Sequence, residues 1–159
     1  MAMITLYLDI DGTLINTHER YDCNFPIARC CFDFLQFATE NFNCKWLSFH
    51  TRGERGSLVY DVFEEALGGK ELSTDWKIIL DCFEPAFWIN KKTDGVDFKQ
   101  DFIIVDDDCD PVDCYVLQQN NALDCLIPVY INSMPFDLLR VKAVLEELLE
   151  CRENQANHK

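Results

Sequence analysis

The stretch that decides the fold lies near the start of the chain and reads Ile4-Thr5-Leu6-Tyr7-Leu8-Asp9-Ile10-Asp11-Gly12-Thr13-Leu14. Its apolar part predicts a buried strand, and Asp9 and Asp11, one residue apart, point to the same side of that strand. A buried carboxylate without a partner is strongly destabilising, so a pair at a strand tip requires something that neutralises it. A hard divalent cation held by oxygen ligands is the natural candidate. Because Gly12 permits the turn that exposes the strand end, the stretch predicts an active site there.

The composition is typical of a globular protein with one domain. The 159 residues are 48% hydrophobic and 13% aromatic, which is enough for a substantial core. No apolar run reaches the length of a membrane span, and the N-terminus lacks the basic region and cleavage site of a signal peptide. We expect a single α/β domain over residues 1–151 and a polar, frayed C-terminal tail over residues 152–159.

The cysteines and the net charge indicate the compartment and the class of partner. The nine cysteines are odd in number and include no Cys-x-x-Cys pair, which predicts reduced thiols in a cytoplasmic protein rather than disulfides or a zinc site. The formal net charge of −14 disfavours extended binding to nucleic acid through a surface field. It does not exclude an anionic substrate, because a bound cation and a few basic groups dominate the local potential.

The six residues Asp9-Ile10-Asp11-Gly12-Thr13-Leu14 resemble the first motif of the haloacid dehalogenase superfamily, in its phosphatase and phosphotransferase branch. The resemblance implies that Asp9 attacks phosphorus and that Asp11 is the general acid and base. The dehalogenases proper lack the second aspartate, so Asp11 argues against carbon–halogen chemistry.

A second motif follows the predicted strand Cys44–Leu47, which ends in the apolar pair Trp46-Leu47. The family closes this strand with a Ser or Thr that binds phosphate, and a hydroxyl suits the role because it donates a hydrogen bond without competing as a strong nucleophile. The resemblance assigns Ser48, with Thr51 as the alternative if the strand extends to His50.

A basic cluster of His50, Arg52 and Arg55 comes just past this strand. Ligands of open parallel α/β sheets bind at the carboxyl ends of the strands. The cluster therefore fits either further phosphate or carboxylate groups of a substrate, or solvated loop charges.

The third and fourth motifs of the family are a lysine and, downstream of it, an apolar strand that closes in two acidic residues. The run 91–96 holds Lys91 and Lys92, and the apolar residues 102–105 are followed by Asp106, Asp107 and Asp108. The resemblance assigns Lys92 to phosphate binding, with Lys91 as the alternative. It assigns Mg²⁺ to Asp9, Asp11 (through its backbone carbonyl), Asp106 and Asp107. Adjacent carboxylates would repel one another without a nearby cation or solvent, and a solvated acidic loop does not explain why two strands end alike.

The rest of the chain alternates between helical and strand-like patterns. Residues 125–131 predict a buried strand, residues 76–80 fit a short strand or a helix turn, and residues 83–88 fit either core or a flap over the site. The predicted helices start after Asn24 and Pro26, after Ser57, near Val112 and at 133–135.

Alternating strands and helices predict an α/β fold, a Rossmann-like parallel sheet with helices on both faces. The resemblance narrows this expectation to a fold like that of the haloacid dehalogenases without a large cap domain, and to a Mg²⁺-dependent phosphomonoester hydrolase that forms an aspartyl-phosphate. Its substrate would be a phosphorylated small molecule or a macromolecular end. Two alternatives stay open: a non-catalytic binding or regulatory module, and a nucleic-acid end-healing phosphatase. The order of the motifs does not fit a receiver domain.

Overall fold

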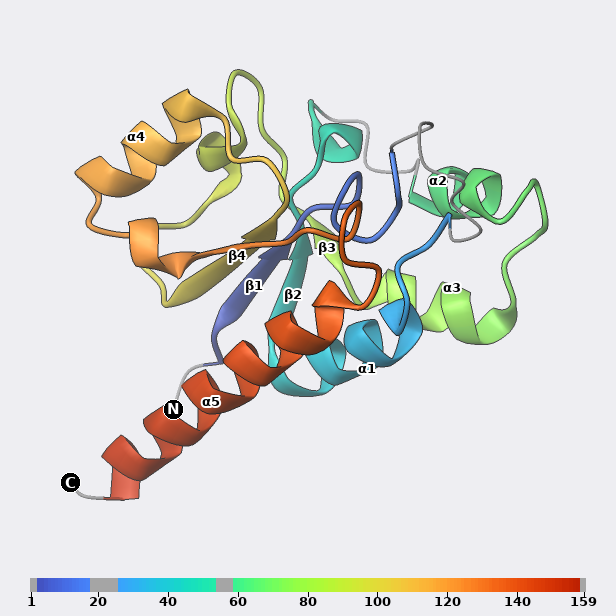
Figure 1. The fold of residues 1–159 in the computed structure, drawn as a ribbon. Coiled ribbons are helices and arrows are strands. Elements are labelled where there is room, and N and C mark those ends of the chain that lie inside the picture. Colours follow the sequence, from blue (N-terminus) through green and yellow to red (C-terminus); the bar gives the residue numbers. More distant parts are fainter. Residues whose placement is uncertain (1–2, 18–25, 54–58, 158–159) are drawn as a thin grey trace.

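The computed structural model describes residues 3–17, 26–53 and 59–157 (Figure 1). Five strands form one open sheet in which all neighbours are parallel, with the order β3-β2-β1-β4-β5. The strand from the opening stretch lies at its centre, so the predicted parallel α/β architecture is confirmed. The strands are β1 (Thr5–Leu8), β2 (Asn43–Trp46), β3 (Glu84–Pro85), β4 (Phe102–Asp106) and β5 (Leu126–Pro128).

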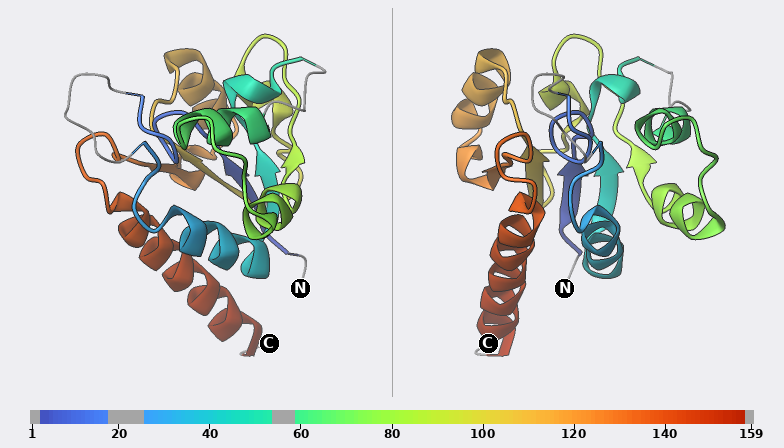
Figure 2. Two further views of the ribbon diagram at one scale, coloured as in Figure 1. Left: turned by 90° about the vertical axis from the view of Figure 1, so that its right-hand side faces the viewer. Right: turned by 45° about the vertical axis from the view of Figure 1, so that its right-hand side comes forward.

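Helices cover both faces of the sheet. Figures 1 and 2 show α1 and α5 side by side on one face and α4 on the other. Three short 3₁₀ helices, η1 (Phe49–Thr51), η2 (Lys92–Gly95) and η3 (Leu123–Cys125), lie in the connections. The α-helices are α1 (Cys31–Asn41), α2 (Val59–Ala66), α3 (Thr74–Asp81), α4 (Pro111–Gln119) and α5 (Asp137–Asn157). None of the helices within the described ranges is long and apolar enough to cross a membrane.

The alternation of side chains along β1 divides the core in two. Leu6 and Leu8 pack in a large apolar cluster with residues of α1 and α5, whereas Tyr7 packs with Ile104 of β4 and Leu117 of α4 in a smaller one. A strand that is apolar on both faces is the expected consequence of helices on both sides of a parallel sheet. By the same alternation, the residue that follows Leu8 belongs to the α4 side.

The first predicted helix starts later than expected. The pattern placed its beginning near Pro26, but α1 begins at Cys31. The intervening chain is held close to the loop after β1 by two contacts. Ile27 forms an antiparallel β-bridge with Ile15, and Ala28 N donates a hydrogen bond to Leu14 O. The helix begins only after a left-handed residue, Cys30, at φ 60°. Asn24, the expected cap, lies outside the described residues, and so does Ser57, the expected cap of α2.

Residues 70–90 contribute side chains to the core, although Phe87 and Ile89 of this segment are exposed. The ambiguous segment around Trp76 is the helix α3, capped by Ser73, whose hydroxyl accepts a hydrogen bond from Trp76 N. The aromatic stretch that follows forms the edge strand β3 and buries Phe83 and Trp88. Phe83 stacks on Trp46 with a centroid distance of 4.1 Å, which fixes this edge of the sheet on the core.

The C-terminal end departs from the expected frayed tail. Helix α5 continues to Asn157, well past the last apolar residues of its periodic pattern. The segment includes the good helix formers Arg152, Glu153, Gln155 and Ala156, and the Arg152 guanidinium pairs with Asp101 at 2.5 Å. The expected polar tail is therefore helical through Asn157. The strand β5 is shorter than the expected 125–131 and comprises Leu126–Pro128.

Candidate functional site

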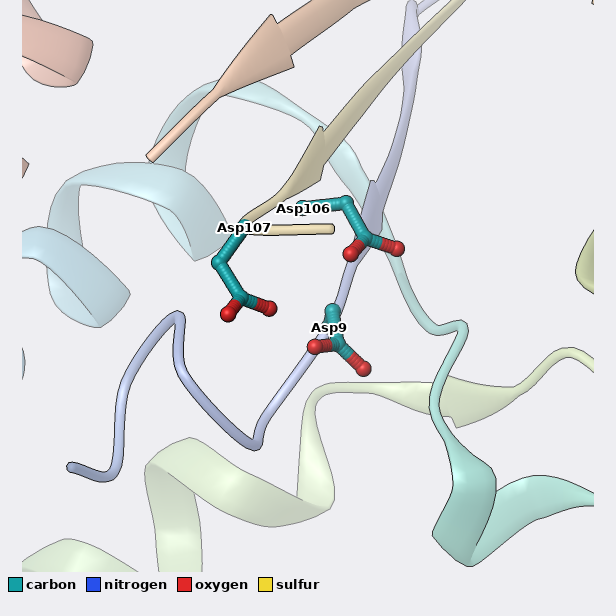
Figure 3. Close-up of side chains that lie close together, drawn as sticks. All are labelled: Asp9, Asp106 and Asp107. Carbon is teal, nitrogen blue, oxygen red and sulfur yellow. The ribbon is translucent and has the colours of Figure 1, made fainter. Parts of the chain in front are cut away.

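Two neighbouring strands bring the acidic residues of the first and fourth motifs together. Leu8 of β1 pairs with Val105 of β4, and Asp9 N donates a hydrogen bond to Val105 O at 3.0 Å. Asp9 and Asp106 therefore emerge side by side at the carboxyl edge of the sheet. One oxygen each of Asp9, Asp106 and Asp107 lies within 4.8 Å of the others, and Figure 3 shows the three side chains gathered at the strand ends. These three residues are called the carboxylate cluster below.

Lys92 joins the carboxylate cluster from η2. Its Nζ lies 3.0 Å from Asp9 Oδ1 and 2.7 Å from Asp106 Oδ2, and its side chain is only 13% exposed. The following residue anchors η2 to α4, because Thr93 N and Oγ1 both donate hydrogen bonds to Asp113 Oδ1, at 2.8 and 2.7 Å. Lys91 points elsewhere and pairs with Asp94 at 2.8 Å. Of the two candidate lysines, the structure brings only Lys92 to the carboxylates.

The charges of this group do not balance. One ammonium faces three carboxylates, and burial raises the pKa of Asp106 and of Asp107 to about 6 and also raises the pKa of Asp9. Burial alone would lower the pKa of Lys92, but the neighbouring carboxylates outweigh it and raise that pKa. The fold thus holds carboxylates together in a place where their ionised forms are poorly stabilised by the protein itself.

Asp9 has fewer hydrogen-bond donors than a carboxylate buried this deeply requires, although it shares the Lys92 ammonium with Asp106. The residue is 3% exposed. Lys92 Nζ forms an ion pair with Asp9 Oδ1, but among the described residues no donor is aligned for a hydrogen bond to that oxygen. Its Oδ2 accepts a long hydrogen bond of 3.4 Å from Thr13 Oγ1. Buried acceptors are normally hydrogen-bonded or bound to a metal. The oxygen donors of Asp9, Asp106 and Asp107 therefore fit a hard divalent cation.

Gly12 is needed for more than the turn after β1. It has a φ of +75°, and a Cβ at this position would lie 1.9 Å from Asp107 Oδ2. A side chain here would both strain the backbone and displace Asp107 from the carboxylate cluster. The sequence motif indicated the turn, but the close approach to Asp107 appears only in three dimensions.

The Asp11 side chain lies outside the carboxylate cluster. It is 37% exposed, and its Oδ2 lies 2.8 Å from His50 Nε2. This hydrogen bond raises the pKa of His50. The structure thus separates two roles that the sequence placed in one motif, because Asp9 is buried beside Asp106 whereas Asp11 faces solvent and the histidine. Sequence reasoning placed His50 in a basic cluster for substrate groups and missed this pair, since no local pattern links residues on two different strand ends.

The two candidate hydroxyls behave differently. Thr51 is buried and is used by the backbone: its Oγ1 donates to Ser48 O at 2.9 Å and accepts from Ser48 N at 3.2 Å. Ser48 caps η1 at the tip of β2, where its Oγ accepts a long hydrogen bond of 3.4 Å from His50 N. Ser48 Oγ also accepts from Thr51 N in the same capping turn, and Ser48 is as fully buried as Thr51. Both hydroxyls therefore stabilise the turn, and only Thr51 Oγ1 also donates to an acceptor among the described residues.

Of the predicted basic cluster, the structure describes His50 and Arg52, which have separate partners. The Arg52 guanidinium lies over the Trp88 ring, 5.3 Å from its centroid, and its Nε donates to Ile89 O at 3.0 Å. Arg55 lies outside the described residues. Sequence reasoning also missed Phe49, which is 65% exposed and whose ring centroid lies 5.7 Å from Lys92 Nζ. Only the placement of Lys92 reveals this aromatic residue as a neighbour of the site.

Comparisons with known proteins give no relative for this chain: no family model matches it, and searches of curated proteins and of solved structures return no match. The interpretation of the site therefore depends on its geometry and on the motifs quoted above.

Proposed function

We propose that this protein is a Mg²⁺-dependent phosphomonoester hydrolase of the haloacid dehalogenase type, which works through an aspartyl-phosphate. The observation that carries the proposal is the arrangement of Asp9 and Asp106, which end adjacent strands and share one buried ammonium from Lys92. Within the described ranges no donor is aligned for a hydrogen bond to Asp9 Oδ1. The order of the four motif-like segments along the chain supports the same conclusion.

The metal would be held by carboxylate oxygens of Asp9, Asp106 and Asp107, and by the backbone carbonyl of Asp11 that the family resemblance implies. When bound, Mg²⁺ neutralises the charge that otherwise opposes the approach of a carboxylate to an anionic phosphoryl group. The raised pKa values of Asp106 and Asp107 are consistent with this assignment, because ionised carboxylates in this place require an added positive charge.

The protein's own residues would divide the reaction into two steps. In the first, an Asp9 oxygen forms a bond to phosphorus, the ester P–O bond breaks, and Asp11 gives its proton to the leaving oxygen. In the second, Asp11 takes a proton from a water molecule that attacks phosphorus, the Asp9–phosphorus bond breaks, and inorganic phosphate leaves. The position of Asp11 suits this exchange, since its carboxylate is partly exposed and oriented by His50.

Lys92 and Ser48 would hold the non-bridging phosphoryl oxygens. The ammonium of Lys92 already lies against the proposed nucleophile, and it would bind the negative charge that develops on the transferring group. The Ser48 hydroxyl would add a neutral donor from the neighbouring strand tip.

A phosphatase assay tests the proposal. A panel of phosphomonoesters is incubated with Mg²⁺ or with EDTA, and the Asp9→Asn variant is run in parallel. A matched control is Asp75→Asn, which changes an exposed aspartate in the first turn of α3. We expect turnover that requires Mg²⁺, is lost in Asp9→Asn and is kept in Asp75→Asn. Metal-independent turnover, or full activity of Asp9→Asn, would overturn the mechanism. A complete lack of turnover would favour the non-catalytic binding module.

A further inference from the structure

A pocket of about 340 Å³ opens beside Lys92 and Asp106, on the α4 side of the sheet. Lys92 borders both this pocket and the carboxylate cluster. If Lys92 binds the phosphoryl group of a phosphomonoester, the pocket lies directly beside the leaving group of that ester. Small-molecule sites typically span about 300–1,000 Å³. The pocket is at the small end of that range, so it suits one compact leaving group rather than a length of polymer.

One side of the pocket is aromatic. Phe49 and Trp88, called the aromatic wall below, meet edge to face with a centroid distance of 5.5 Å and an interplanar angle of 69°. Trp88 is buried and fixed by its Nε1, which donates to Ser48 O at 2.8 Å, whereas Phe49 is largely exposed. A rigidly backed phenyl ring that faces solvent next to a phosphate position offers a flat surface on which another ring can stack.

Another part of the pocket lining is acidic. Asp108 and Asp110 border it where the chain enters α4, and both residues are exposed. Asp110 is engaged as the cap of α4, since its Oδ1 accepts from Val112 N at 2.7 Å. Asp108 is therefore the carboxylate better placed to accept a hydrogen bond from a ligand. A ligand that fits both parts carries a flat ring with an amino group at its edge.

We propose that the substrate is a nucleoside monophosphate, with its base stacked on Phe49 and with a preference for bases that carry an exocyclic amino group. The inference rests on the proposed function and narrows its substrate class. A small aliphatic phosphate would leave the aromatic wall uncovered. A polynucleotide end fits less well, because the pocket is small and the chain carries a net charge of −14.

Steady-state kinetics on two substrates test the stacking contact. We compare kcat/KM for CMP and for glycerol 3-phosphate in the wild type and in Phe49→Ala. Base–aromatic stacking corresponds to about a tenfold to hundredfold loss on truncation to alanine. We expect a loss of that size for CMP and a change below about twofold for glycerol 3-phosphate. Phe49→Trp should keep the activity on CMP. The matched control is Tyr115→Ala, which removes a similarly exposed aromatic side chain (61% against 65%) from α4 outside the pocket.

A second comparison tests the acidic part of the lining. Asp108→Asn should lower the ratio of kcat/KM for CMP to that for UMP by about threefold to tenfold, the value of one hydrogen bond at a partly exposed position. The two substrates differ at C4, where CMP has an amino group and UMP a carbonyl oxygen, and at N3, which accepts a hydrogen bond in CMP and donates one in UMP. An unchanged ratio would remove the assigned preference.

The possible outcomes separate this inference from the proposed function. If glycerol 3-phosphate is hydrolysed as efficiently as CMP, and Phe49→Ala affects both alike, the substrate class is wrong and the phosphatase stands. Hydrolysis of a 5′-phosphorylated oligonucleotide without hydrolysis of CMP would likewise overturn the inference, in favour of an end-healing enzyme. If no phosphomonoester is hydrolysed, both the inference and the proposed function fail.

Discussion

Asp137 and Asp9 are two buried aspartates in very different surroundings. They are almost equally hidden from solvent, at 4% and 3% exposure. Asp137, at the start of α5, accepts hydrogen bonds from Arg140 Nε and Nη2, both at 2.7 Å, and from Tyr130 N at 2.9 Å. Burial alone would raise its pKa, but these donors outweigh it and lower that pKa. At Asp9 the donors are too few and the pKa is raised.

The difference shows how a structural carboxylate is distinguished from a functional one. At Asp137 the protein supplies every partner that the ionised form needs, so the residue stabilises the fold. The carboxylate cluster lacks such partners, and its ionised form is stable only when a further positive charge is added. Under-supplied carboxylates at the carboxyl edge of a parallel sheet are what a cation site requires before the cation binds.

The largest expected effect comes from making the same Asp→Asn substitution at Asp9 and at Asp137. Asp9→Asn should lower kcat by roughly 10⁴-fold or more, because it removes the proposed nucleophile. Asp137→Asn, its matched control, should leave kcat and KM within about twofold. Phosphatase kinetics in Mg²⁺ measure both. Equal kinetic losses in the two variants would show that Asp9, like Asp137, acts only through the fold.

The two adjacent lysines provide a second contrast. Lys92→Gln should lower kcat/KM by roughly 10²–10³-fold, because it removes a charge from the site of the transferring group. Lys91→Gln removes a charge one residue away that pairs with Asp94 and borders the same pocket, and we expect a loss of kcat/KM below about fivefold. The thermal midpoints of both variants show whether they are folded. A larger kinetic effect at Lys91 would mean that the lysine has been assigned wrongly.

For stability, the larger loss is expected in Asp137→Asn and not in Asp9→Asn. In metal-free buffer, Asp137→Asn should lower the free energy of unfolding by about 1–3 kcal/mol, since it breaks a charge-assisted pair with Arg140 and weakens the bond to Tyr130 N. Asp9→Asn should leave this free energy unchanged or raise it. Urea denaturation without Mg²⁺ provides the measurement, and destabilisation by Asp9→Asn greater than that by Asp137→Asn would contradict the comparison.

The smallest effect concerns pH. The pKa values of Asp106 and Asp107 are raised to about 6 in the folded protein, above the ordinary value of 3.8. A carboxyl group with a raised folded pKa binds its proton more tightly in the folded state, so this contribution to stability is lost as pH rises from about 4 to about 6. Asp137 acts in the opposite direction, because its lowered pKa removes stability as pH falls below about 4.

Asp107→Asn tests the pH effect at one residue. In metal-free buffer at pH 7 we expect the variant to be more stable than the wild type by about 1 kcal/mol, a figure reduced from the full pKa shift because Asp107 is partly open to solvent. Adding Mg²⁺ should stabilise the wild type more than the variant. Urea denaturation from pH 4 to pH 8 measures both effects. The account would be contradicted if the free energy of unfolding increased between pH 4 and pH 6 by more in the wild type than in Asp107→Asn.

The sequence predicted the backbone of the site well, for a simple physical reason. Two apolar strands that end in aspartates bring those aspartates to the same edge of a parallel sheet. That Asp9 and Asp106 would meet there followed from the family resemblance, because the pattern does not say which strands are neighbours. The position of Lys92 followed from a family resemblance and not from periodicity. Nothing local predicted the pair of Asp11 with His50 or the approach of Gly12 to Asp107, because both depend on how separate loops meet.

The errors at the helix ends have a similar origin. Pro26 is a good residue for a first helical turn, yet the pairing of Ile27 with Ile15 keeps the chain extended there. At the other end, the apolar periodicity of α5 stops before the helix does, because helical propensity and the pair of Arg152 with Asp101 extend it. In both places a tertiary contact decided the boundary.

The most direct test of the central claim is to locate a divalent cation. Crystals grown with Mn²⁺, used as an anomalous scatterer in place of Mg²⁺, would give its position independently of any activity. We predict a single strong anomalous peak among the carboxylates of Asp9, Asp106 and Asp107, and its loss in Asp106→Asn. A crystal in which this place holds no peak at saturating Mn²⁺, with the three carboxylates arranged as in the wild type described here, would contradict the account.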